Sequence, residues 1–335
     1  MKKTDLSLGV SYFGNYYKSH AKKDLSEISG CCNYVVLPFS ESDLIFHKGA
    51  FGEIVKEARR MGLTVWVDPW ALGGVFGGEA FSKFLLEHRR AWQFLSNGRS
   101  VPCACFNNPD FRLYMKDWIR TISTLGGQVI FWDEPHYYMD INLELKGIYA
   151  CTCWVCREKY KKEFDCDMPD RLDARSRDFR LNTIGSFLED MMSFAKKQGL
   201  KNALTIYAIR GIAQYDLIWE RAASLSNVDI FGCDPYWRWH FKHNPRKFVW
   251  DFSKRVVDSC NNYKKEPHIW IQAMKLPKGK EYEIEDAAIA AYDAGVRNMA
   301  AWSYDGGELI DGLYSPRYDL VWKTVSKAFK KLRKL

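Results

Sequence analysis

Two acidic residues stand side by side at the end of an apolar run, in the segment Phe131-Trp132-Asp133-Glu134-Pro135. A carboxyl pair in that position costs free energy unless its charge is partnered or used. Trp132 and Asp133 would raise the pKa of Glu134, which makes Glu134 a candidate general acid. The alternative is structural, with Asp133 capping a loop and Glu134 paired with Arg or Lys. We favour the catalytic interpretation, because perturbed carboxyl groups cluster at functional sites.

Cysteines form the second group of residues whose type and spacing could do chemistry. The chain has ten, and three of them follow a C-x-C-x-x-C pattern at 151–156. This spacing places three thiolates within one tight turn, and a fourth would complete a closed tetrahedral zinc site, which is structural because no position stays open. An iron–sulfur cluster or free core cysteines are the alternatives. The predicted ligands are Cys105, Cys151, Cys153 and Cys156, with Cys103 or Cys166 as substitutes for Cys105.

Eight short apolar or β-branched runs alternate with helical patterns along the chain, which indicates parallel β/α units. The runs are 6–13, 33–39, 63–70, 128–135, 203–208, 228–237, 268–274 and 296–305. The clearest helical patterns are 51–61, 108–125, 180–198, 242–260, 284–294 and 317–334. We predict a single (β/α)8 TIM barrel over 1–335, with long connections at 71–107 and 136–178. The second is a Cys-rich insertion that zinc would stabilise. An open doubly wound sheet is the alternative, but no Gly-rich phosphate loop follows the first run.

The carboxyl ends of the strands carry the active site in barrels of this kind. Carboxylates and aromatic rings are frequent there, and aromatic residues make up 15% of the chain. Sugar rings stack on indole faces and their hydroxyls bond carboxylates and amides, so we expect a carbohydrate site. The candidate substrate-binding residues are Tyr12, Asp68, Trp70, His136, Tyr207, Tyr236, Trp237, Gln272, Trp302 and Tyr304. Arg210, Trp239, His240 and Lys275 also fall near predicted strand ends.

Some of these residues have a second interpretation. Trp237 and Trp239 fit either an outer sugar subsite or a packed loop, and Asp68 fits either sugar binding or loop capping. Trp302 is favoured as a sugar platform, because a polar Ser-Tyr-Asp segment follows it. Glycine pairs at 73–74 and 77–78 suggest either a mobile lid or a series of turns.

Several of these segments resemble the clan A (β/α)8 glycoside hydrolases: Glu134-Pro135 at the fourth strand and Ala301-Trp302-Ser303-Tyr304-Asp305 at the eighth. Around the cysteines the chain resembles the catalytic domain of the family 42 β-galactosidases more closely. The segments concerned are Cys105-Phe106-Asn107-Asn108-Pro109 and the C-x-C-x-x-C element followed by Arg157. The resemblance implies Glu134 as general acid/base and one zinc bound by four thiolates.

The chain departs from the clan A pattern at two positions. Asp133 stands where the clan usually has Asn, and Gln272 stands where it has a Glu nucleophile at the seventh strand. An amide cannot serve as that nucleophile. The usual double displacement is therefore in doubt.

Three hypotheses follow for a glycoside hydrolase or a relative of one that acts on a small oligosaccharide or glycoside. The first is substrate-assisted hydrolysis of a 2-acetamido sugar, in which Asp133 orients the acetamido group, Glu134 protonates the leaving oxygen, and Tyr236 or Tyr304 bonds the acetamido oxygen. The second pairs Glu134 with Asp234 or Asp305 as the second carboxylate. The third is a sugar-binding barrel whose catalysis is lost or altered. A metal-dependent hydrolase is disfavoured, since the seven His are scattered.

The net charge of +8 arises mostly from the end of the chain. Six Lys and Arg between residues 323 and 334, with no acid among them, account for most of it and predict the solvated face of a terminal helix. We therefore expect no nucleic-acid partner. No apolar run is long enough for a membrane span, and no secretion signal is evident, which predicts a cytoplasmic protein with reduced thiols. No organic cofactor is expected, and the oligomeric state stays open.

Overall fold

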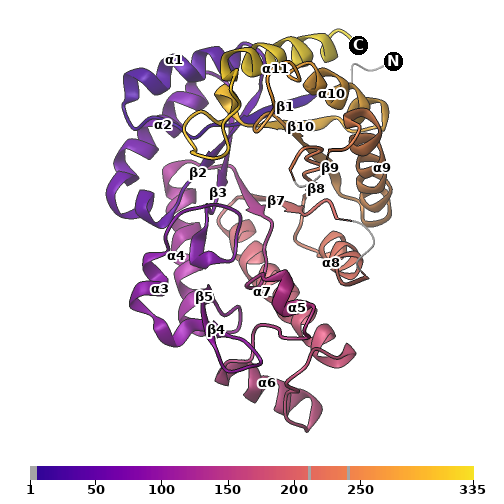
Figure 1. Cartoon of the computed structure of the whole chain (residues 1–335). Coiled ribbons are helices and arrows are strands. Elements are labelled where there is room, and N and C mark those ends of the chain that lie inside the picture. The colour runs from indigo at the N-terminus through magenta and orange to yellow at the C-terminus, as the bar shows by residue number, and fades with distance from the viewer. Residues whose placement is uncertain (1–5, 210–212, 240–241) are drawn as a thin grey trace.

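Eight parallel strands close into a barrel in the computed structural model, which describes residues 6–209, 213–239 and 242–335 (Figure 1). Each barrel strand pairs with the next one along the chain, and the last pairs with the first. The barrel strands are β1 (Ser7–Ser11), β2 (Tyr34–Pro38), β3 (Thr64–Asp68), β6 (Val129–Asp133), β7 (Lys201–Ile206), β8 (Ile230–Cys233), β9 (Glu266–Gln272) and β10 (Asn298–Trp302). All eight predicted strands and the TIM-barrel fold class are confirmed, and the open sheet is excluded.

Helices surround the barrel, one after nearly every strand (Figure 1). They are α1 (Lys18–Ser29), α2 (Lys48–Arg60), α4 (Pro109–Leu125), α7 (Ala174–Lys197), α8 (Ala213–Ser224), α9 (Pro245–Tyr263), α10 (Glu283–Asp293) and α11 (Tyr318–Leu332). Local chemistry sets their ends: in α4 the Asn108 side chain accepts from the N–H groups of Asp110 and Phe111, and Gly126 ends the helix with φ +93°. Within the described residues, no helix combines the length and apolarity needed to cross a bilayer.

One helix boundary differs from the prediction. Helix α7 begins at Ala174 rather than near 180, because Asp173 and Ser176 form a capping box at its start. The Cys-rich connection after β6 therefore ends at 173. The helical pattern of the sequence does not extend to this start, because the cap lies in a polar segment.

The connections after β3 and β6 both contain structure of their own. The first holds η2 (Leu72–Gly74), α3 (Lys83–Glu87), η3 (Arg89–Ala91) and the hairpin strands β4 (Trp92–Phe94) and β5 (Ser100–Ala104). The second holds α5 (Ile141–Glu144) and α6 (Trp154–Phe164). Figure 1 shows these elements together at one end of the molecule, away from α10 and α11. Backbone bonds join them, from Ser96 N–H to Tyr149 O at 2.8 Å and from Thr152 N–H to Phe94 O at 2.8 Å.

Side chains along each strand point alternately into and out of the barrel, and large ones fill its inside. Tyr34, Trp66, Phe131 and Trp270 form one buried cluster there. The Tyr34 ring stacks on Trp66 with centroids 4.5 Å apart, and its hydroxyl donates to Asn298 Oδ1 at 2.9 Å. Side chains two residues further along these strands must therefore face the carboxyl end of the same interior.

Candidate functional site

Three aspartates from separate strands face the carboxyl end of the barrel interior. Asp68 ends β3, Asp133 ends β6, and Asp234 directly follows β8. Each lies at an even spacing from a residue that packs inside the barrel, namely Trp66, Phe131 and Ile230. Glu134 comes next to Asp133, and its positive φ of +42° turns the chain at this point. Four carboxyl groups thus meet at one end of the barrel.

Burial and the repulsion between neighbouring charges raise the pKa values of these four carboxyl groups, which favours their protonated forms. Burial first, and then the charges of Asp133 and Glu134, raise the pKa of Asp68 well above its usual value. Burial also raises the pKa of Glu134, and the neighbouring Asp234 adds to that rise through its charge and a hydrogen bond. The pKa of Asp234 itself is raised to about 7, mainly by burial. Glu134 and Asp234 share a hydrogen bond, which requires a proton on one of the two carboxyl groups, so the pair holds at least one proton.

Two tyrosines and a histidine surround Glu134. The Tyr207 hydroxyl donates to its carboxyl, and burial followed by the charge of Glu134 raises the pKa of Tyr207. The pKa of Tyr236 is raised by burial and then by Asp234. Burial lowers the pKa of His136, so this ring is neutral, and its Nδ1 bonds the Glu134 carbonyl at 2.6 Å. The tyrosines are the hydroxyl donors of the site.

The backbone on both sides of Glu134 is held by the connection that follows β3. Gly77 N–H donates to Asp133 O at 3.0 Å, and His136 N–H donates to Val75 O at 2.9 Å. Glu134 N–H donates to Thr205 O at 3.1 Å on β7. The glycine pairs are therefore turns in a fixed loop that clamps the acid.

Buried Glu41 fixes that loop in turn. Its carboxylate accepts from Gly73 N–H at 3.0 Å, from Ser82 Oγ at 2.6 Å and from Phe84 N–H at 2.6 Å. Glu41 is 1% exposed, so its role is structural.

Aromatic rings lie on the β1, β3 and β10 side of the barrel end. Trp70 and Trp302 are nearly parallel with centroids 6.3 Å apart, and Phe13 meets both edge-on at 4.8 and 5.0 Å. Trp302 is 8% exposed, and Trp70 and Phe13 are half-buried. These rings offer an apolar surface of the kind that stacks on sugars.

Two buried carboxyl oxygens in this group lack partners. Among the described residues, Asp68 Oδ1 and Asp234 Oδ1 are buried and accept no hydrogen bond. Buried polar atoms are usually bonded, so such atoms mark places where a bound hydroxyl or water would fit.

Two predicted substrate contacts are interior residues instead. Trp237 is 0% exposed and its indole N–H donates to Glu283 at 2.8 Å, which corresponds to the packed-loop interpretation. Gln272 is also 0% exposed. Its Oε1 accepts from Arg238 N–H at 2.9 Å and its Nε2 donates to Met274 O at 3.0 Å. Because both ends of this amide bond backbone, it is not directed at a ligand.

Asp305, Tyr304 and Tyr12 line a different cavity, of about 170 Å³, between the chain after β1 and the loop after β10. Tyr12 donates to Asp24 Oδ2 at 2.7 Å. Burial, and then the charges of Glu27 and Asp24, raise the pKa of Asp305 to about 6. The charges that act most strongly on Asp305 thus come from helix α1 and not from the cluster of carboxyl groups around Glu134. Arg210 and His240 lie outside the described residues.

One charged residue near the site, Glu79, is absent from the sequence prediction, whereas Lys275 and Trp239 fall near predicted strand ends. Burial raises the pKa of Glu79, the charge of Lys275 lowers it, and Glu79 itself raises the pKa of Asp133 and Glu134. The Lys275 ammonium lies 4.2 Å from the centroid of the Trp239 ring. Glu79 lies in the connection after β3, beyond the strand end, where reading strand ends alone cannot find it. The Gly77-Gly78 pair before Glu79 was the available signal.

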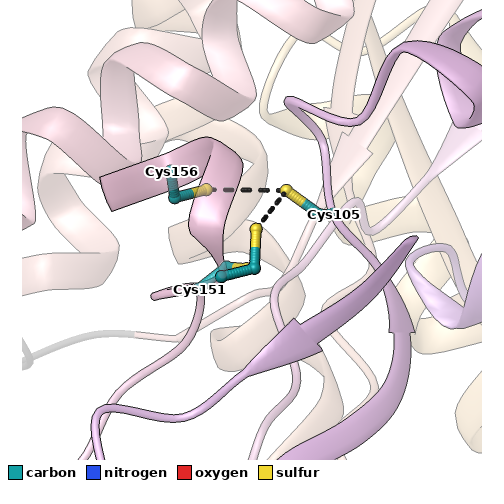
Figure 2. A group of neighbouring side chains, drawn as sticks. Cys105, Cys151 and Cys156 are labelled. Carbon is teal, nitrogen blue, oxygen red and sulfur yellow. Dashed lines mark hydrogen bonds between the residues drawn. The ribbon is translucent and has the colours of Figure 1, made fainter. Parts of the chain in front are cut away.

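Four cysteines meet between the two long connections. Cys105 follows β5, Cys151 and Cys153 precede α6, and Cys156 lies in its first turn. All four are buried and their sulfurs lie within 4.8 Å of one another. Figure 2 shows Cys105 facing the others, with its Sγ 3.5 Å from those of Cys156 and Cys153.

This sulfur set fits a metal ion. Four thiolates at the usual zinc–sulfur distance of about 2.3 Å lie ~3.8 Å apart in a tetrahedron, close to the spacing observed. The substitutes proposed for Cys105 lie elsewhere: Cys103 Sγ donates to Gly74 O at 2.9 Å, and Cys166 Sγ accepts from Arg175 at 3.3 Å.

Comparison with known proteins identifies the architecture. No protein-family model matches the chain, and no curated protein matches it. Solved structures do. The chain has the fold of the (β/α)8 glycoside hydrolases.

Three structures illustrate the likeness. A β-galactosidase from the Antarctic haloarchaeon Halorubrum lacusprofundi aligns over 98% of this chain with a TM-score of 0.73 and 12% identity. The catalytic domain of a β-amylase from Paenibacillus polymyxa aligns over 97% of this chain and 99% of its own length, with a TM-score of 0.64 and 11% identity. GH5_18 from Streptomyces cattleya, in complex with Manβ1-4GlcNAc, aligns over 98% of this chain and 81% of its own, with a TM-score of 0.61 and 14% identity.

The likeness is one of fold. The chain spans 58% of the length of the H. lacusprofundi enzyme. The resemblance to the (β/α)8 glycoside hydrolases is confirmed at the level of the fold.

The contact between Gly77 and Asp133 yields a prediction about the clamp on the acid. A Cβ at Gly77 would lie 2.3 Å from Asp133 Oδ2. Gly77→Ala should therefore lower the free energy of unfolding by about 1–3 kcal/mol, as overpacking does. The measurement is urea unfolding of the parent, both single variants and the double variant Gly77→Ala/Asp133→Ala. We expect the alanine at 77 to cost clearly less when Asp133 is truncated. An equal cost in both backgrounds would show that Asp133 does not press on this loop.

Proposed function

We propose that the protein is a glycoside hydrolase that acts on a small oligosaccharide or glycoside, with Glu134 as general acid/base. The observation that carries the proposal is a partly exposed Glu134 whose carboxyl lies among those of Asp133, Asp234 and Asp68, where burial and the charge of Asp234 raise its pKa. A carboxylic acid kept neutral at neutral pH can protonate a glycosidic oxygen. The tryptophan surface beside it and the fold of the structural neighbours support a carbohydrate substrate, the second by analogy only.

The second carboxylate of an ordinary mechanism is hard to place. Glu134 and Asp234 share a hydrogen bond, so their carboxyl oxygens are in direct contact, unlike the separated pairs of retaining enzymes (about 5–5.5 Å) or inverting ones (about 6.5–9.5 Å). Asp305 lies in the other cavity, and Gln272 has no nucleophilic oxygen to offer. These placements favour the substrate-assisted mechanism.

In that mechanism the substrate is a 2-acetamido glycoside. Its acetamido carbonyl oxygen attacks C1 as the bond from C1 to the leaving oxygen breaks, and the Glu134 proton passes to that oxygen. Asp133 accepts from the acetamido N–H, and the Tyr236 hydroxyl donates to the carbonyl oxygen. Water, deprotonated by Glu134, then attacks C1 and reopens the ring intermediate. Asp234 and Asp68 set the proton occupancy and accept sugar hydroxyls.

A second candidate function is a carbohydrate-binding barrel without catalysis. The observation in its favour is Gln272, whose amide serves only the backbone. Such a protein would bind a saccharide through the same aromatic surface and leave it intact.

We also propose that Cys105, Cys151, Cys153 and Cys156 hold one zinc ion. The ion would cross-link the connections after β3 and β6, and so stabilise the segment 136–173 as a subdomain of a single barrel domain. The set is closed by four thiolates, so the metal would supply structure and no step of the reaction. No organic cofactor is needed for the chemistry above.

A glycoside screen tests the catalytic proposal. We expect the parent to release nitrophenol from 2-acetamido glycosides and not from the matching 2-hydroxy sugars, because the acetamido oxygen is the nucleophile. Glu134→Gln should lower kcat about 10²–10⁴-fold, since the proton donor is lost. Asp305→Asn should keep most of the activity. Equal cleavage by Glu134→Gln would refute the acid assignment, and binding of the sugar with no cleavage by the parent would favour the second candidate.

Metal content tests the cysteine proposal. Elemental analysis of the purified chain should give about one zinc per chain. Cys156→Ser should lose the metal and unfold at lower temperature, whereas Cys103→Ser and Cys260→Ser, which change buried cysteines outside the cluster, should keep it. Zinc-free parent protein, or equal zinc in all the variants, would contradict the assignment.

A further inference from the structure

Lys275 stands out among the residues that the catalytic proposal does not use. It follows β9 by three positions and its side chain is exposed. Its ammonium lies 4.2 Å from the ring centroid of Trp239, which is 36% exposed. Within the described part of the chain, no carboxylate lies at ion-pair distance from this ammonium. The charge is therefore open to a ligand.

The backbone of Lys275 is held in an uncommon conformation. Its φ is +52°, a left-handed value that a residue with a side chain adopts at a cost. Two bonds from the loop after β10 sustain it: Lys275 N–H donates to Leu313 O at 3.0 Å, and Leu276 N–H donates to Ser315 Oγ at 3.1 Å. Backbone strain that the surroundings maintain is frequent at binding sites. It fixes the point from which the Lys275 side chain departs.

The Lys275–Trp239 pair lies beside the catalytic carboxyl group. Trp239 contacts Tyr236, with ring centroids 6.3 Å apart, and Asp234 acts on the Tyr236 hydroxyl. On the other side, Glu79 interacts electrostatically with both Lys275 and Glu134. The Lys275–Trp239 pair is thus separated from Glu134 by one residue on each side, Tyr236 on one and Glu79 on the other.

The two side chains present complementary chemistry. An exposed indole stacks on the apolar face of a pyranose ring. An ammonium above the same indole pairs with an anionic substituent on that ring, and its hold on the indole alone is weak at an exposed site. By contrast, an anionic substituent among the carboxyl groups around Glu134 would add a charge to a buried site that already disfavours charge. An acidic sugar would therefore be excluded from the position that is cleaved and accepted at the position next to it.

We propose that Lys275 and Trp239 form a subsite for an anionic sugar, which carries a carboxylate or a sulfate, next to the 2-acetamido sugar that is cleaved. The inference rests on the proposed function and names its substrate class, acidic oligosaccharides. Trp239 holds the ring, and Lys275 selects for its charge.

Binding to the full chain with Glu134→Gln, which should not turn the ligand over, tests the subsite. Three probes are titrated by calorimetry and tryptophan fluorescence: neutral N,N′-diacetylchitobiose, its 6-sulfated form, and a disaccharide of glucuronate and N-acetylglucosamine. We expect the anionic probes to bind about two- to fivefold more tightly than the neutral one, as for one exposed ion pair, and to lose this advantage in high salt. The two anionic arms distinguish carboxylate from sulfate recognition.

Variants of Lys275 test whether its charge produces the preference for anionic probes. Lys275→Met should abolish the preference for anionic probes and leave the affinity for the neutral one, whereas Lys275→Arg should retain the preference. Lys278→Met, which removes an exposed lysine three residues further along, is the matched control and should bind as the parent does.

The two proposals fail separately in this design. If the preference follows Lys275 but the parent cleaves no glycoside, the catalytic proposal falls and the subsite stands. If the parent cleaves but Lys275→Met keeps the same ratio of affinities, the subsite is overturned. Absence of binding by all three probes also overturns it.

Discussion

The crowding of carboxyl groups at the carboxyl end of the barrel is the constraint that organises this molecule. Asp68, Asp133 and Asp234 enter from three strands, and Glu134 follows directly on β6. Several ionised carboxylates cannot share a buried site, because each charge raises the cost of the next. The group persists because burial and the neighbouring charges raise the pKa values of these carboxyl groups and favour their protonated forms, and Glu134 and Asp234 share a hydrogen bond. The same arrangement that makes the site tolerable supplies the acid that the proposed reaction needs.

The connections after β3 and β6 serve that constraint. Glu134 has a positive φ, which costs on the order of 1–3 kcal/mol for a residue with a side chain. The loop after β3 offsets this by bonding the backbone immediately before and after the acid. The Glu41 carboxylate holds the same loop through hydrogen bonds to its backbone. The cysteine cluster joins the β4–β5 hairpin of that loop to the connection after β6. The proposed metal site at the cluster and the proposed acid Glu134 are thus linked through one continuous loop.

Particular residues show what the amino-acid sequence could and could not reveal. The strands were predictable, since β-branched and apolar runs bounded by turns have few other uses, and Asp133 with Glu134 was conspicuous because charge follows an apolar run directly. The cysteine spacing likewise indicated its own cluster. Trp237 and Gln272 could not be assigned in the same way. Their position near a strand end does not say whether the side chain faces a ligand or, as here, bonds Glu283 and neighbouring backbone. Glu79 comes from a loop whose course depends on tertiary contacts.

The most direct test is the protonation of Glu134 itself. The carboxyl carbon of glutamate, labelled with carbon-13, is followed by NMR as a function of pH in the parent and in Glu134→Gln, which assigns the signal. The account predicts one glutamate that titrates well above the usual value near 4.3 and moves to lower pH in Asp234→Asn, because the charge that raises its pKa is removed. As the pH rises through that pKa, the acid form and the ability to protonate a leaving group are lost together. A Glu134 that titrates at its ordinary value, or is unaffected by Asp234→Asn, would contradict the account.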